Sequence, residues 1–532
     1  MKRNNILKKF ICASFSLVML ASCTDDLNRF PENDSTDTEV YSTFDGYKGA
    51  LAKVYGGYTL TGNQGPAGSP DISGLDEGTY ADFLRGFFNV QEVPTDEVKC
   101  IWLQDEGIPG LNYINLSSEN PFARGFYNRC MLHIMYANAF LRNATDASID
   151  SKGFTSDEVT EIKHFRAEAR FLRAFEYWVM MDVYGNPPFV DENVEFGSLP
   201  EQISRKDLFN YVEKELLEIE SLLVDPRSNE YGRADKAAAW ALLARIYLNA
   251  EVYTGQARYA DAITYSGKVI GAGFSLMDNY EHLFLADNNK NNNEIILSIN
   301  YDGVNTQNYA GTTFLINSSY NAAVESEYGL NYGLTDNAAW SGNRATTGLT
   351  DRFNQDKDKR FLFVGDTPDM DDLTNFRQGL ATYKYRNISV AGASGSHARY
   401  ADNDFPLFRL AEMYLVYAEA VKRGGTGGSD ANALLYMNKL RERAFGNSSE
   451  NYSSFANVSL DEILNERSRE LYWECHRRTD LIRFGMFTTA KYVWPWKGGS
   501  KDGRSVSSHY NIYPIPSTDI MANPNLKQNP NY

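Results

Sequence analysis

The chain has 532 residues, and its 52 Lys and Arg against 69 Asp and Glu give a formal net charge of −17. This acidic balance argues against a nucleic-acid-binding protein, because such a protein needs a basic face to displace counterions from phosphates. Hydrophobic residues make up 43% of the chain and aromatic residues 13%. That is enough apolar surface to offset chain entropy, so a largely disordered chain is also excluded.

The first residues read as a secretion signal. Basic residues within positions 2–9 precede an apolar stretch at 10–21, which is shorter than the roughly 20 residues a spanning helix needs. The stretch ends in the sequence LASC, whose cysteine is Cys23. This ending is similar to the site at which bacteria attach a lipid to the cysteine and cleave before it. We therefore expect a signal peptide at 1–22 and a lipid-anchored tether at 23–40; a plain signal peptide is the alternative.

Three cysteines remain for the folded part if Cys23 carries lipid: Cys100, Cys130 and Cys475. An odd number cannot all pair, and no Cys or His spacing typical of a metal site accompanies them. We expect buried free thiols. The Asn-rich segment 287–291 lacks the glycine and the downstream acid of a calcium loop, and a solvated loop is the favoured interpretation. No cofactor is expected, and calcium binding is left open.

Helical periodicity dominates several blocks of the chain. In chain order, the predicted helices span 122–141, 157–184, 204–223, 235–253, 259–270, 410–421, 431–443, 460–471 and about 481–489. Segments 59–121 and 274–404 are instead loop-rich, and the second contains strand-like runs at 294–300 and 313–316. We expect a single mostly α domain over 41–532, with the binding surface on these two insertions, because loops on a rigid scaffold usually carry function.

Residues 235–270 resemble a tetratricopeptide unit. Trp240, Leu243, Ala244 and Tyr247 follow the spacing W-x2-L-[GA]-x2-Y of that repeat. Small alanines let two helices approach closely, while the large residues fill the grooves between neighbours. Residues 410–443 look like a second pair of this kind.

Several motifs resemble those of the SusD/RagB family of Bacteroidetes outer-membrane nutrient-binding lipoproteins. They are FRAEARFLRA at 165–174, GRADKA at 232–237, FRLAE at 408–412 and YPIP at 513–516. Other stretches are similar to the starch-binding member of that family, among them DEG at 76–78, PTDE at 94–97, DGV at 302–304 and WPWKGG at 494–499. The resemblance covers nearly the whole chain. It implies a scaffold of helical pairs with a loop-rich, partly irregular ligand-binding face and a few short strands.

The same resemblance implies a non-catalytic cell-surface protein that binds starch or malto-oligosaccharides. The partner it implies is a SusC-like, TonB-dependent transporter of the outer membrane. Aromatic rings bury the apolar faces of sugars, while acids and arginines exchange hydrogen bonds with the hydroxyl rim. The ligand-binding residues that carry over are the rings of Trp102, Tyr309 and Trp340 and the polar groups of Asp76, Arg85 and Asp105.

The sequence departs from the starch-binding member at three points. Asp105 stands where that protein has Asn, Cys100 stands where it has a further Trp, and the segment between Phe353 and Phe376 is much shorter. These departures leave the identity of the glucan open.

The same residues also have purely structural interpretations. The three rings could be core aromatics, Asp76 a turn cap, Arg85 a surface ion-pair partner and Asp105 a solvated loop acid. Two other classes of function remain. One is a glycoside hydrolase, which needs two carboxylates about 5 or 6.5–9.5 Å apart. The other is a helical-repeat scaffold that binds only protein.

Overall fold

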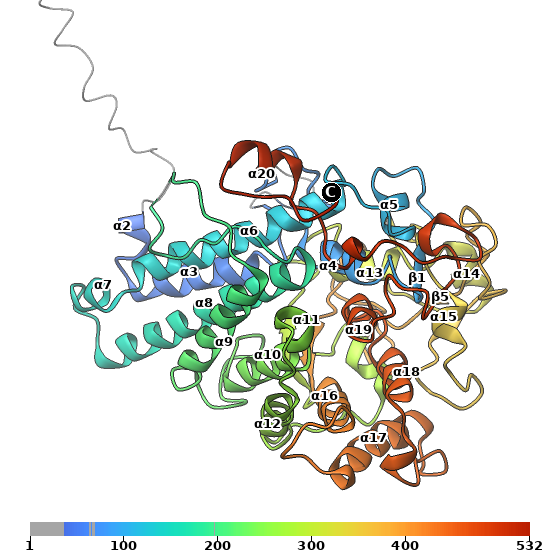
Figure 1. Cartoon of the computed structure of the whole chain (residues 1–532). Helices are drawn as coiled ribbons and strands as arrows, with labels where there is room; N and C mark the ends of the chain where they lie inside the picture. The colour runs from blue at the N-terminus through green and yellow to red at the C-terminus, as the bar shows by residue number, and fades with distance from the viewer. Residues whose placement is uncertain (1–36, 63–64, 66–69, 196) are drawn as a thin grey trace, which may run out of the picture.

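A computed structural model describes residues 37–62, 65, 70–195 and 197–532 (Figure 1). The predicted signal peptide, Cys23 and most of the tether lie outside these residues. The protein is mostly helical, as predicted. In Figure 1 the long helices of the N-terminal half lie at the left, the helices of residues 410–471 lie at the lower centre and right, and short strands, short helices and loops lie at the right.

The N-terminal half is built on three packed helices. These are α3 (Phe44–Gly56), α6 (Pro121–Asn143) and α8 (Ser156–Val183), each in contact with the other two. A capping box between Thr155 and Glu158 begins α8, satisfying backbone N–H groups that have no partner within the helix. The helices predicted at 122–141 and 157–184 are thereby confirmed.

The next helix, α9 (Arg205–Ile219), packs on α8 and begins at its predicted cap, Ser204. The predicted end near residue 223 is wrong. The N–H groups of Leu222 and Leu223 both bond to the carbonyl of Ile219, so the chain tightens into a turn that buries Leu223.

Two helical pairs form the centre of the scaffold. The first is α10 (Lys236–Leu248) with α12 (Tyr259–Ile270), and the second is α16 (Leu410–Lys422) with α17 (Asp430–Phe445). Helices α12 and α16 also pack on each other, so the two pairs stack although a long insertion separates them in the chain.

The sequence predicts one unbroken helix over 235–253, and this prediction is wrong at one residue. The helix is interrupted at Asn249, after which α11 (Ala250–Thr254) begins. The Asn249 amide donates to the carbonyl of Arg245 at 3.0 Å and accepts from Arg483 at 2.9 Å. A side chain that bonds the preceding turn competes with regular helix hydrogen bonding.

Among the described residues, six short strands form three antiparallel pairs. They are β1 (Val98–Cys100) with β3 (Asn343–Ala345), β2 (Ile295–Ile299) with β6 (Phe405–Arg409), and β4 (Phe363–Val364) with β5 (Ala381–Thr382). The strand predicted at 294–300 is confirmed. The one predicted at 313–316 is wrong, because these residues lie in α13 (Gly311–Asn317), which is buried throughout. A short apolar run does not distinguish a buried strand from a buried helix.

The C-terminal region holds α18 (Leu460–Leu471), as predicted, and α19 (Arg477–Arg483). The helix predicted near 481–489 is therefore misplaced. Gly485 adopts a left-handed conformation, φ 64°, and the N–H of Met486 bonds back to the carbonyl of Leu481. This closure ends the helix.

The remaining short helices connect these parts. They are α2 (Asp37–Val40), α4 (Phe83–Gln91), α5 (Ile108–Asn112), α7 (Asp146–Asp150), α14 (Ala322–Glu327), α15 (Thr347–Thr350), α20 (Ser517–Ala522) and the 3-10 turns Tyr280–Phe284, Phe455–Asn457, Lys497–Gly499 and Ser508–Asn511.

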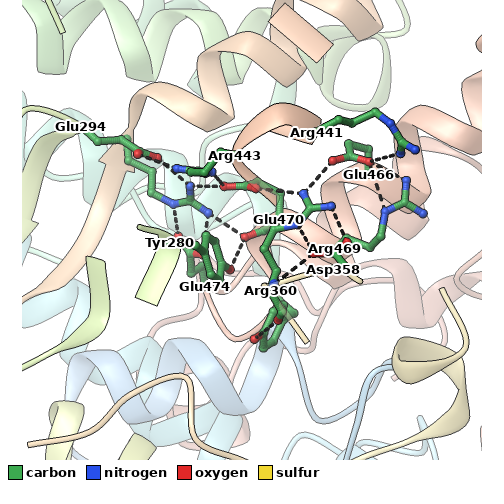
Figure 2. Close-up of polar contacts among 12 residues, drawn as sticks. Tyr280, Glu294, Asp358, Arg360, Arg441, Arg443, Glu466, Arg469, Glu470 and Glu474 are labelled. Atoms are coloured by element: carbon green, nitrogen blue, oxygen red, sulfur yellow. Dashed lines mark hydrogen bonds and ion pairs between the residues drawn. The ribbon is translucent and has the colours of Figure 1, made fainter. Parts of the chain in front are cut away.

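A buried network of ion pairs ties the C-terminal helices to the strands (Figure 2). Glu470 of α18 accepts from Arg409 of β6 at 2.5 Å, from Arg360 at 3.0 Å, and from Arg443 of α17. The Glu470 side chain is fully buried. Ionised groups are tolerated away from water only when they are paired, so this network depends on each of its members.

The network predicts a loss of stability in acid. Burial alone raises the pKa of Glu466, but Arg360 and Arg469 outweigh it and lower that pKa to about 2. An unfolded glutamate titrates near pH ~4.3. Because the folded-state pKa is depressed, the stabilisation is present above pH ~4.3 and is lost as the pH falls toward 2. We expect urea unfolding at a series of pH values to give a free energy that drops across this window. A flat profile there contradicts the prediction.

Cys100, Cys130 and Cys475 are free and buried, as predicted. Burial raises the pKa of the Cys100 thiol to about 12. A thiol that stays protonated at neutral pH is a poor nucleophile, so Cys100 serves as a small packed side chain.

Candidate functional site

Two tryptophans far apart in the chain meet at one end of the β1–β3 pair. Cys100 pairs with Asn343, and the N–H of Ile101 extends the ladder to the carbonyl of Gly342 at 3.0 Å. This register places Trp102 beside Trp340. The Trp102 indole nitrogen donates to the Trp340 carbonyl at 3.3 Å, across 238 residues of sequence. Both side chains are half-buried.

Gly342 makes room for this arrangement. A Cβ atom at this position would lie 2.4 Å from the Trp102 ring, closer than any real contact. The ring therefore lies directly against the backbone of the facing strand, and the absence of a side chain at residue 342 permits it.

We expect Gly342→Ala to displace the Trp102 ring and to lower the free energy of unfolding by about 1–3 kcal/mol. Near-UV circular dichroism reports the ring environment, and urea denaturation reports stability. The matched control is Gly267→Ala in α12, where nothing lies within 4 Å of the added Cβ. The prediction is wrong if the two variants behave alike.

The loop that carries Trp340 has an unusual backbone. Asn337, Ala339 and Ser341 have positive φ angles of 52°, 64° and 56°, which cost non-glycine residues about 1–2 kcal/mol each. The loop is fastened to the end of α13 by backbone hydrogen bonds, including one from the Trp340 N–H to the Asn317 carbonyl at 2.8 Å. The position of Trp340 is therefore set by the backbone.

Arg85 lies against the Trp102 ring. It stands in the first turn of α4, whose cap is Asp82, and its side chain is buried. The guanidinium carbon lies 4.6 Å from the centre of the Phe314 ring and 5.8 Å from that of Trp102. One guanidinium nitrogen donates to the Gly78 carbonyl at 2.7 Å. Arg85 is thus not a surface ion-pair partner; it joins Trp102 to the loop that carries Asp76.

Asp76 lies at the surface of that loop. One of its carboxylate oxygens accepts from the Thr79 N–H at 2.7 Å. Asp76 therefore caps a turn, as its structural interpretation predicted. The loop also contacts Tyr309, because a Cβ atom on Gly78 would lie 3.1 Å from the Cβ of Tyr309.

Asp105 is exposed on the turn after β1, and its N–H donates to the Trp102 carbonyl at 3.0 Å. A residue that the sequence did not single out, Tyr80, follows Asp76 in the same loop, and its N–H donates to the Asp76 carbonyl at 3.1 Å. Burial raises the pKa of the Tyr80 hydroxyl, and the charges of Asp105, Glu106 and Asp76 raise it further. Both predicted acids therefore lie within electrostatic reach of one tyrosine. No spacing pattern marks Tyr80 in the sequence.

Arg399 holds the parts of the site around Tyr309 together. The sequence did not single out this residue either. Arg399 donates to the Tyr309 hydroxyl at 2.9 Å and to Asp336 at 2.9 Å. Asp336 lies just before the Trp340 loop, so Arg399 joins that loop to Tyr309. The Tyr400 ring packs edge-on against Tyr309 with centroids 5.4 Å apart. An arginine in a Gly- and Ser-rich stretch gives no local signal of this role.

The six predicted residues are thus linked by contacts that also run through Gly78, Asp336 and Arg399. We call Trp102, Tyr309, Trp340, Asp76, Arg85 and Asp105 the ledge. Its three rings are half-buried, its two acids are exposed and its arginine is buried. Cys100 lies under it, in the core. This combination fits a ligand with flat apolar faces and a rim of hydroxyl groups.

Other features of the structure lie apart from this site. An apolar cavity of about 310 Å³ lies beside α3 and β2, with Leu51, Tyr55 and Ile299 in its wall, and no ledge residue lines it. Among the residues that the structure describes, no cluster of His, Cys, Asp or Glu is arranged to hold a metal ion. Within the same residues, no helix is both long and apolar enough to cross a bilayer.

Comparison with protein families gives two matches. A model described as "SusD family" matches residues 331–532, and one described as "Starch-binding associating with outer membrane" matches residues 112–248. The Starch-binding protein SusD of Bacteroides thetaiotaomicron is 37% identical, and the alignment covers 98% of this chain and 99% of that protein. A SusD-like protein of Bacteroides ovatus is 24% identical over 98% of this chain and 92% of its own length.

Solved structures with the same fold are more distant in sequence. Surface glycan-binding protein A of Bacteroides thetaiotaomicron, in complex with laminarihexaose, superposes with a TM-score of 0.66 at 19% identity, covering 91% of this chain and 99% of that one. A SusD superfamily protein of Parabacteroides distasonis gives a TM-score of 0.70 at 20% identity over 91% of this chain and 99% of that one.

Proposed function

The chain belongs to the SusD family, and from this premise we propose that it binds glycan at the cell surface without altering it chemically. The ligand we propose is starch or malto-oligosaccharide, the α-1,4-linked glucans, held on the ledge. The observation that carries the proposal is the meeting of Trp102 with Trp340 across the β1–β3 pair, with Tyr309 joined to both through Arg399 and the loop around Gly78.

The chemistry of the ledge supports a sugar polymer. Three rings offer apolar faces for the C–H faces of glucose, and the Asp76 and Asp105 carboxylates accept from its hydroxyls. Each hydrogen bond contributes about 1 kcal/mol and each good aromatic contact about 0.5–1.5 kcal/mol. After the cost of association, this gives a Kd of roughly ten micromolar to one millimolar.

A different glycan is the alternative ligand. A structure with the same fold holds laminarihexaose, and this chain differs from the starch-binding relative's pattern at Asp105 and Cys100. The Cys100 difference removes one ring that the relative has, but Trp102, Tyr309 and Trp340 all remain, which is why the α-glucan proposal comes first.

We further propose that the protein is tethered to the outer membrane by lipid on Cys23. There it would act with a SusC-like, TonB-dependent transporter that imports the bound oligosaccharide. Supporting the location, a family model named for outer-membrane association matches residues 112–248.

Isothermal titration against a panel of glycans tests the proposal. We expect binding of maltoheptaose and amylopectin in the range given above, and no binding of dextran or xylan. Laminarihexaose serves as the probe for the alternative ligand. A preference for laminarihexaose over maltoheptaose rejects the α-glucan proposal, and failure to bind any member of the panel rejects glycan binding. Release of shorter sugars from maltoheptaose identifies a glycoside hydrolase instead.

A further inference from the structure

A second pair of aromatic side chains, Tyr113 and Trp496, lies outside the ledge. Their ring centroids are 6.2 Å apart and their planes are inclined by 37°. Both side chains are half-buried, as the three ledge rings are. Tyr113 directly follows α5, and Trp496 lies in the glycine-rich loop 494–503, so the pair joins two distant parts of the chain.

Tyr113 is held in a fixed relation to the ledge. Its neighbour Asn112 accepts from the Cys100 N–H at 3.0 Å and donates to the Cys100 carbonyl at 2.7 Å. Cys100 is the last residue of β1, two residues before Trp102. The end of α5 is therefore fastened to the strand that positions the ledge.

Trp496 is presented by a strained loop. Its φ angle is 68°, a left-handed conformation that a bulky residue adopts only at an energetic cost. Lys497 anchors the loop, because its buried ammonium group donates to the carbonyls of Met486, Thr489 and Tyr492 at 3.0, 2.8 and 2.7 Å. Gly503 is also required, since a Cβ there would lie 2.1 Å from the Trp494 carbonyl oxygen.

Polar groups lie near Trp496 in space or in the chain. The Trp496 indole donates to the Met370 carbonyl at 2.6 Å, and an exposed ion pair joins Lys501 to Asp371 at 2.8 Å. Burial raises the pKa of the Tyr113 hydroxyl, and within the described residues no hydrogen bond occupies that hydroxyl. Inclined rings with polar groups at their edges repeat the chemistry of the ledge.

We propose that Tyr113 and Trp496 form a second sugar-binding platform, which contacts another stretch of the same α-glucan chain. This inference rests on the proposed function of the ledge. Two platforms on one rigid body raise the affinity for a long polymer more than for a short oligosaccharide, because the second contact becomes intramolecular.

The test compares a long with a short ligand. In Trp496→Asn the ring is removed, while asparagine tolerates a positive φ; in Trp496→Phe a ring is kept and only the indole donor is lost. We expect Trp496→Asn to weaken binding in amylopectin gels about three- to tenfold and to leave the maltoheptaose Kd within about twofold of wild type. Trp496→Phe should resemble wild type with both ligands.

Each outcome is decisive. Amylopectin binding by Trp496→Asn equal to that of wild type overturns the second platform and leaves the proposed function intact. So does an equal loss for amylopectin and maltoheptaose, since it would make Trp496 a support of the ledge. A wild-type protein that is not retarded by amylopectin overturns the proposed function, and the second platform with it. Thermal unfolding of each variant identifies any loss that reflects misfolding.

Discussion

Replacing Glu470 by Gln is expected to lower the free energy of unfolding by about 3–5 kcal/mol, because removal of one partner leaves buried charges uncompensated. Glu470 is the acceptor shared by Arg360, Arg409 and Arg443 (Figure 2). The substitution keeps the size of the side chain and removes its charge. Three buried guanidinium groups then share fewer carboxylates, and α17, α18 and β6 lose the negative charge on which they meet.

Urea denaturation followed by circular dichroism measures the change. Lys48→Gln is the matched control, since it breaks an exposed ion pair with Glu230 whose side chains are 54% and 62% exposed. Exposed pairs contribute about 0–1 kcal/mol, so this control should change stability little. A Glu470→Gln variant as stable as Lys48→Gln would show that the buried network contributes specificity of packing rather than stability.

Trp340→Ala and Trp102→Ala are each expected to reduce retardation of the protein in amylopectin gels strongly. Losing a stacked indole removes about 2 kcal/mol of contact with the sugar faces, which is about thirtyfold in affinity. From a starting Kd of ten micromolar to one millimolar, such a loss gives a Kd of about 0.3 to 30 mM, so the variants should migrate much faster in the gel than wild type.

The fold should survive the Trp340 change. The loop is held through its backbone, and the Trp340 side chain itself makes one hydrogen bond, from its indole to the Asn337 carbonyl at 2.6 Å. Trp240→Ala is the matched control, because Trp240 is also half-buried but belongs to α10, in the scaffold. We expect Trp240→Ala to lower stability and to leave retardation unchanged. Unaltered retardation of the Trp340→Ala variant would remove the ledge from the binding mechanism.

The sequence predicts the scaffold well, and physical reasons explain where it does not. Long amphipathic helices such as α6 and α8 carry many periodic positions, so their pattern is unambiguous. Local hydrogen bonds override the pattern at the ends of helices and at breaks, as at Asn249 and Gly485. The apolar run in α13 is buried on all sides, so it lacks the alternation that distinguishes a helix from a strand.

The ledge could not be assembled from spacing alone. Its six residues were predicted from a family resemblance, and the pairing of β1 with β3, which brings Trp102 to Trp340, joins segments with no local signal for each other. Arg399 and Tyr80 were missed for the same reason. The positive φ angles around Trp340 fall on Asn, Ala and Ser, and of these only Asn is known to favour such a conformation.

The β1–β3 ladder limits which sequence changes can alter the relative position of the two indoles during evolution. The spacing of the two indoles is set by peptide groups, which every sequence possesses, and so mutations elsewhere can alter neighbouring loops without moving Trp102 against Trp340. Insertion of one residue within β1 would do the opposite, because successive side chains of a strand point to opposite faces. Natural variation in ligand preference should therefore accumulate in loop length and in the polar groups around the rings, while insertions and deletions avoid the strand pair itself.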